Sequence, residues 1–66
     1  SNNPYESLLT KREREILNLL STGLIYKQIA DTLFISVETV KSHCHNIYDK
    51  LHVTTKMEAV NKYFKK

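Results

Sequence analysis

The segment from residue 29 to residue 51 constrains the fold more than any other stretch of this chain. Its second part carries apolar side chains at spacings of four, three and four residues. On a helix with about 3.6 residues per turn, these spacings form one narrow stripe. The stripe consists of Val40, Cys44, Ile47 and Leu51. A shorter helix with Ile29, Ala30 and Leu33 on one side precedes it, and only residues 34–36 lie between the two. The pattern predicts two helices held at a fixed angle by a short turn.

The side of the second helix opposite this stripe is polar. It carries Glu38, Lys41, Ser42, His45 and Asp49. Because the apolar stripe must face the core, this row is expected to face solvent. A helix that is anchored by one face and rich in hydrogen-bonding groups on the other suits the major groove of DNA.

Length and composition narrow the remaining choices. A chain of 66 residues forms one small domain, and its single cysteine, Cys44, excludes an internal disulfide. No apolar run approaches the roughly 20 residues of a membrane span, and no signal peptide is evident, so a cytoplasmic location is expected. The net charge of +3 favours an anionic partner. No cofactor is expected. The sequence contains no Gly-rich phosphate loop and no nucleophile beside a base, so an enzyme is not expected.

The remaining elements also read as helices. Residues 1–8 are polar and lack periodicity, which indicates a linker or an expression remnant, and residues 9–66 form the domain. Capping-box spacings predict helix starts at Thr10 and Thr55, and Ser36 is expected to cap the polar-faced helix. Gly23 is placed to end the first helix. A further helix over about residues 26–33 completes a compact, all-α, four-helix domain.

Taken together, the motifs resemble the LuxR-type helix-turn-helix domain, the output domain of NarL/FixJ response regulators and of quorum-sensing regulators. The resemblance covers residues 9–60 and rests on LTKREREIL at 9–17, Gly23, KQIA at 27–30, LFIS at 33–36, TVKSH at 39–43, NIY at 46–48 and KL at 50–51. It implies a homodimer on double-stranded DNA, and an N-terminal receiver or sensor domain that this chain does not contain.

The resemblance also implies roles for particular residues. Base edges would be read by Lys41, Ser42 and His45. Phosphate contacts are expected from Lys27, Thr39, His43, Lys50 and Lys56. A dimer contact is expected from Met57, Val60, Asn61 and Phe64. For each set a plainer reading stays open: a solvated helix face for the reading row, solvated lysines at 50 and 56, a packed histidine at 43, and a fourth helix that simply completes the core.

Four positions depart from the family pattern. Ile25 and Tyr26 stand where small polar residues are usual, so the start of the second helix lacks a capping oxygen. His52 replaces a glycine and must turn left-handed or end its helix differently. Lys56 replaces an arginine, and His45 is an unusual reader of bases.

The run His43–Cys44–His45 also invites a metal-site reading. Residues two apart on a helix diverge by about 200°, so the two imidazoles cannot converge on one ion. No metal site is therefore expected. The family resemblance implies the sequence-specific DNA-binding output domain of a bacterial LuxR-family transcriptional regulator, excised from a two-component response regulator. The alternative is a protein-interaction module of the same fold that has lost DNA binding.

Overall fold

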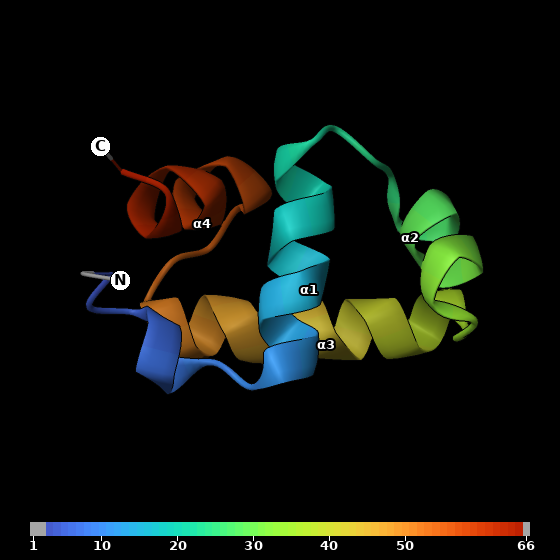
Figure 1. Cartoon of the computed structure of the whole chain (residues 1–66), viewed down its shortest axis with the longest axis horizontal. Coiled ribbons are helices and arrows are strands. Elements are labelled where there is room, and N and C mark those ends of the chain that lie inside the picture. Colours follow the sequence, from blue (N-terminus) through green and yellow to red (C-terminus); the bar gives the residue numbers. More distant parts are fainter. Residues whose placement is uncertain (1–2, 66) are drawn as a thin grey trace.

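The computed structural model describes residues 3–65, and within them the chain is helical with no strand. The elements are a single 3-10 turn, η1 (Glu6–Leu8), and the helices α1 (Lys11–Ser21), α2 (Tyr26–Leu33), α3 (Val37–Leu51) and α4 (Lys56–Tyr63) (Figure 1). The predicted compact all-α domain of four helices is confirmed. None of the helices in this described part is long and apolar enough to cross a membrane.

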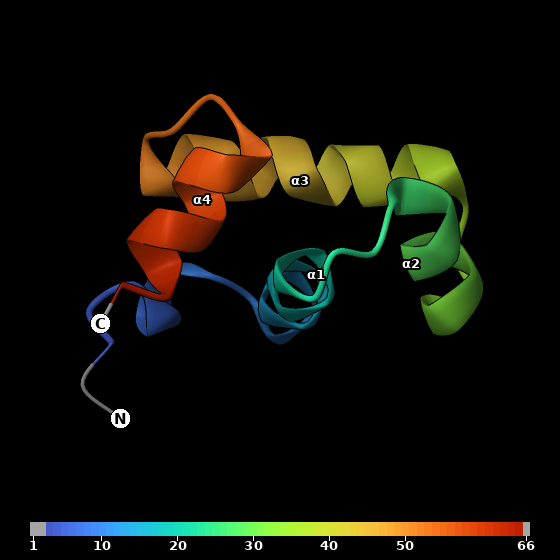
Figure 2. The same cartoon turned by 90° about the horizontal axis from the view of Figure 1, so that it is seen from above.

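The longest helix, α3, is the base on which the others pack. α1 crosses α3 near its middle, and α2 and α4 lie toward opposite ends of it (Figures 1 and 2). The predicted stripe of α3 is buried, with exposed fractions of at most 2%. Around it lie the other buried apolar side chains: Leu9, Ile16, Leu17, Leu20, Ile29, Ala30, Ala59 and Tyr63. Every helix therefore contributes to one core.

Side-chain caps fix where the helices begin. Thr10 and Glu13 form the expected capping box of α1, Thr55 and Glu58 that of α4, and the Ser36 hydroxyl accepts from the Thr39 amide at 3.0 Å. The start of α2 is stabilised in a way that the sequence analysis missed. Ile25 has no capping oxygen, but its backbone N–H donates to Oε1 of Gln28 at 2.9 Å. Half of a capping box thus remains at this helix start.

Two residues other than glycine adopt the left-handed conformation. His52, with φ of 58°, takes this conformation directly after α3, and the Val53 amide donates to the Tyr48 carbonyl at 3.0 Å. Phe34, with φ of 59°, does the same after α2, where the Ile35 amide donates to Ala30. The Phe34 side chain is 93% exposed. A bulky residue gains nothing from contacts there and bears the steric cost of the left-handed region.

We therefore expect Phe34→Gly to raise the free energy of unfolding by about 0.5–1 kcal/mol, because glycine removes the Cβ clash and little packing is lost. Urea unfolding followed by circular dichroism measures the change. Phe34→Ala is the control, since alanine keeps the Cβ atom and should leave stability nearly unchanged. A glycine variant less stable than the alanine variant would contradict the assignment of strain to this turn.

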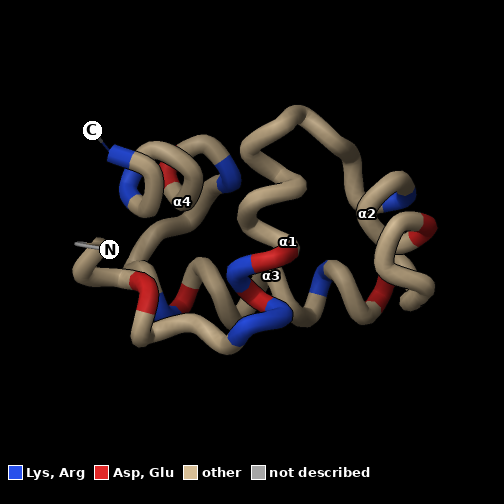
Figure 3. The backbone as a smooth tube through the Cα atoms, in the orientation of Figure 1, with Lys and Arg blue, Asp and Glu red and all other residues tan. Residues whose placement is uncertain are grey.

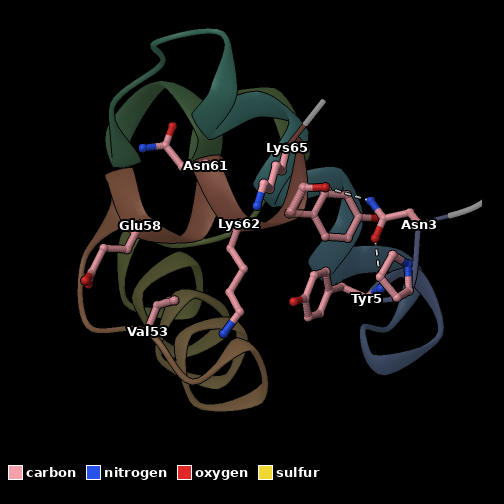
Figure 4. Close-up of a pocket in the computed structure, with 9 residues that line it drawn as sticks. Asn3, Tyr5, Val53, Glu58, Asn61, Lys62 and Lys65 are labelled. Carbon is pink, nitrogen blue, oxygen red and sulfur yellow. Dashed lines mark hydrogen bonds between the residues drawn. The ribbon is translucent and has the colours of Figure 1, made fainter.

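The segment expected to be a linker packs on the domain from Asn3 onward; residues 1 and 2 lie outside the described residues. Nδ2 of Asn3 donates to the Tyr63 carbonyl at 2.7 Å, and the half-buried Tyr5 ring packs against the core (Figure 4). Nη1 of Arg14 donates to the carbonyls of Glu6, at 3.2 Å, and Leu9, at 2.7 Å. One aromatic ring and a few hydrogen bonds anchor this segment, and such contacts leave no periodic pattern in a sequence.

Candidate nucleic-acid interface

The outer flank of α3 carries the predicted reading row. Views from two directions show α1 against one flank of α3 and no helix over the middle of the opposite flank (Figures 1 and 2). The residues exposed on α3 include Glu38, Lys41, Ser42, His45, Asn46 and Asp49. None of the three predicted base readers is packed inside the domain. The helix is therefore pinned by its apolar stripe while its polar side stays accessible.

One close contact between a histidine and a carboxylate lies within this row. Nε2 of His45 is 3.5 Å from Oδ2 of Asp49, one turn further along the helix, and the two side chains are 77% and 72% exposed. A nearly identical pair occupies α2, where Nζ of Lys27 is 3.6 Å from Oδ2 of Asp31. Pairs so exposed contribute little to folding stability. Their side chains remain available to a partner.

Two of the expected phosphate-binding lysines line the same hollow. Lys27 in the first turn of α2 and Lys56 at the start of α4 both line one shallow hollow. The other residues of this hollow are Leu20, Leu24, Ile25 and Tyr26. The spacing of 27 and 56 in the sequence gave no sign that they share a hollow.

Thr39 is exposed in the first turn of α3, and its hydroxyl lies 2.9 Å from that of Ser36. His43 is half-buried.

Lys50 occupies a different environment from the other lysines. Its Nζ lies 2.8 Å from Oε1 of Glu13, whose side chain is only 4% exposed, and the same oxygen accepts from the Thr10 amide at 2.9 Å. Burial raises the pKa of Glu13, but the hydrogen bonds from Lys50 and Thr10 outweigh it, so the pKa lies below its ordinary value of 4.5. The pair joins the start of α1 to the end of α3. A phosphate contact from Lys50 stays a prediction, and it would require this ammonium to leave Glu13.

Beneath the reading row lies a small cluster of polar groups. The Cys44 thiol is buried, and burial raises its pKa, as it does those of the Tyr26 and Tyr48 phenols. Among residues 3–65, no side chain or backbone group lies in good hydrogen-bonding geometry to the buried Tyr48 hydroxyl. A protonated, buried thiol behaves as a small apolar side chain, as the sequence indicated. Within residues 3–65 no group of three or more potential metal ligands occurs.

The predicted dimer residues on α4 are unequally exposed. Met57 is 71% exposed and Asn61 is also exposed, whereas Val60 and Phe64 are half-buried against the core. The Phe64 ring meets Tyr63 edge-on, with centroids 4.9 Å apart. Beside this helix a groove runs between α4 and the N-terminal segment, where Nζ of Lys62 lies 5.7 Å from the Tyr5 ring centroid (Figure 4). Part of α4 thus serves the core, and part is free to meet another molecule.

Basic and acidic positions are mixed along the backbone of the helices (Figure 3). Acidic and basic positions alternate along the first turns of α1, and both signs occur where α2 meets the start of α3 (Figure 3). The outer row of α3 combines the lysine at 41 with the carboxylates of Glu38 and Asp49. This row is therefore polar and of mixed charge, and it is not a basic patch.

A short turn that presents an exposed polar helix on a supporting helix defines a helix-turn-helix DNA-binding domain. Residues 7–63 match the sequence model of a family described as bacterial regulatory proteins, luxR family. The chain therefore belongs to the luxR family, whose domain of this kind binds DNA and is not an enzyme. The match begins two residues before the boundary of 9 that the sequence pattern suggested, within η1.

Several curated relatives are similar over most of this chain. The CsgBAC operon transcriptional regulatory protein of Escherichia coli is 45% identical over 60 residues, which are 91% of this chain and 28% of the relative. The transcriptional regulatory protein LiaR of Bacillus subtilis is 50% identical over 56 residues, or 85% of this chain and 26% of that protein. The oxygen regulatory protein NreC of Staphylococcus carnosus is 44% identical over 66 residues, or 100% of this chain and 30% of that protein. The chain thus spans less than a third of these relatives.

Proposed function

We propose that this chain is the sequence-specific output domain of a bacterial two-component response regulator and that α3 enters the major groove of duplex DNA. The observation that supports this most directly is the exposed polar row on a helix whose opposite face is buried. In such motifs the recognition helix reads base edges while neighbouring elements contact phosphates. Lys41, Ser42 and His45 would contact bases.

The phosphate contacts would surround this row. Lys27 and Lys56 share one hollow, and Thr39 and His43 flank the reading side chains. Contacts to phosphate set the register of a protein on DNA but carry no sequence information. Lys50 can join this set only by breaking its ion pair with Glu13.

Regulation is proposed to come from outside this domain. The relatives are more than three times as long as the matched part, which leaves room for a receiver or sensor domain that controls pairing of two copies. Met57, Val60, Asn61 and Phe64 on α4 would supply the contact within a homodimer. Two copies reading half-sites one helical turn apart would stand about 34 Å from each other. A regulator that acts on chromosomal DNA in a bacterium would work in the cytoplasm.

Salt dependence of duplex binding tests the proposal. If three or four phosphates are contacted per domain, affinity should fall about 40- to 150-fold between 50 and 200 mM salt, because bound counterions are released. Fluorescence anisotropy with a mixture of random duplexes, followed by selection of the bound sequences, measures both affinity and preference. Weak, salt-dependent binding with a recoverable preferred sequence is the expected result.

The same assay addresses a protein-interaction module that has lost DNA binding. Such a module should bind no duplex even at 50 mM salt. The outer row of α3 contains no large apolar anchor of the kind that protein interfaces favour, which supports the DNA-binding function.

A further inference from the structure

Three side chains on the outer flank of α3 follow one another at intervals of one turn. Lys41, His45 and Asp49 are all exposed, and the carboxylate of Asp49 is 3.5 Å from Nε2 of His45. Lys41 lies four residues before His45, one turn earlier on the same face of the helix. The imidazole therefore has a lysine one turn before it and a carboxylate in contact one turn after it.

This arrangement favours one tautomer of the neutral ring. A neutral imidazole carries one N–H group and one lone pair, and the partner of either nitrogen decides which is which. A carboxylate only accepts, so Asp49 favours a proton on Nε2. The lone pair is then left on the other nitrogen. Asp49 thus favours the state with Nδ1 as a hydrogen-bond acceptor.

The bias should grow when DNA binds. In the free domain both partners of the pair are more than 70% exposed, and water screens their interaction. Inside the major groove part of that water is displaced, and the same charges interact through a lower effective dielectric. The tautomer preference therefore becomes strongest where the base is read.

We propose that Asp49 is a positioning residue that makes His45 an acceptor toward DNA through Nδ1. The inference rests on the proposed function, because it requires α3 in the major groove. In that groove adenine offers a donor at N6 and cytosine at N4, whereas guanine and thymine offer only acceptors. Every base pair contains either one adenine or one cytosine, so the assignment fixes the orientation of the pair: the base that touches His45 would be its adenine or cytosine.

Selection of duplexes at pH 8, where imidazole side chains are ordinarily neutral, tests this assignment. The base pair facing His45 is found as the one at which His45→Ala relaxes the preference. At that pair Asp49→Asn is expected to reduce the preference for the selected pair over its reversed orientation by about threefold to tenfold, the range of one hydrogen bond. Preferences at the other pairs should not change, because the amide has the size of the carboxylate but imposes no single tautomer.

A matched control is available on α2. Asp31→Asn removes the same charge from a pair of the same spacing and the same exposure, but outside the reading row, so base preference should stay constant. Asp49→Asn should also have no effect on preference in a His45→Ala background.

Three results would overturn the assignment. If Asp49→Asn changes the base preference in the His45→Ala background, Asp49 itself contacts a base. Uniformly tighter binding to all duplexes would leave only a charge effect. No relaxation at any pair in His45→Ala would remove His45 from the reading row. Failure of the unaltered domain to bind any duplex at 50 mM salt would refute the proposed function itself, and the inference with it.

Discussion

Lys50→Met is expected to lower the free energy of unfolding by about 2 kcal/mol and the melting temperature by about 10 °C. The substitution leaves the carboxylate of Glu13, which is 4% exposed, without its cationic partner. Loss of one partner from a fully buried pair costs more, and the estimate is reduced because the Lys50 side chain is 38% exposed. Thermal unfolding by circular dichroism measures the change.

The control for this variant is Lys27→Met. It removes a lysine from the exposed pair with Asp31, and we expect a change within about 0.5 kcal/mol. The double variant Glu13→Gln, Lys50→Met should cost less than the sum of the single changes, since no buried charge remains. Equal effects of Lys27→Met and Lys50→Met would show that burial of Glu13 has no energetic consequence.

Acid unfolding provides a second readout of the same ion pair. The pKa of folded Glu13 lies below its ordinary value of 4.5. Its stabilising contribution is therefore present above that pH and is lost as the pH falls below 4.5 and through the folded-state pKa. Glu58, whose pKa is also lowered, chiefly by hydrogen bonds from Thr54, contributes separately to the same limb. Lys50→Met should reduce only the contribution of Glu13 to the pH dependence of the free energy of unfolding, and the contribution of Glu58 should remain.

Lys41→Ala is expected to weaken specific binding to DNA by about 1–3 kcal/mol and to relax the preference at one base pair. The reason is that an exposed ammonium on the reading row can donate to guanine O6 and N7. The folded state should be unaffected, since this side chain is exposed and contributes nothing to the core. Binding to a panel of duplexes with single base changes measures both effects.

Lys27→Ala is the contrasting variant for DNA binding. If Lys27 contacts a phosphate, its removal should weaken binding to all duplexes by the same factor. It should also reduce the slope of log affinity against log salt concentration by about one unit. Uniform weakening by Lys41→Ala would place Lys41 among the phosphate contacts as well. The salt dependence of DNA affinity is also measured for Lys50→Met. A reduced slope would show that Lys50 leaves Glu13 to contact a phosphate, and an unchanged slope would show that it does not.

The sequence predicted what local rules determine. The buried stripe of α3, the caps at Thr10, Ser36 and Thr55, and the left-handed option for His52 were confirmed, because each depends on residues within a few positions of one another. Exposure of the reading row followed from the same periodicity. Its assignment to bases came from the family resemblance and stays a prediction.

Contacts between distant parts of the chain could not be predicted in this way. The pairing of Glu13 with Lys50 spans 37 residues, and the hydrogen bond from Asn3 to Tyr63 spans 60. Each depends on the angles at which helices cross, and neither leaves a repeat in the sequence. The capping-box spacing that starts at Thr10 predicts only a local role for Glu13, although its carboxylate also binds Lys50 at the end of α3.

The mixed signs along the outer row of α3 have a consequence for the search along a chromosome. A row that carries two carboxylates and one ammonium gains little from sugar-phosphate backbones in general, because the backbone repels the carboxylates. Encounters with the wrong sequence should therefore be brief, and the domain should spend its time where base edges match. Selectivity at this surface would come as much from rapid dissociation from incorrect sites as from high affinity for the correct site.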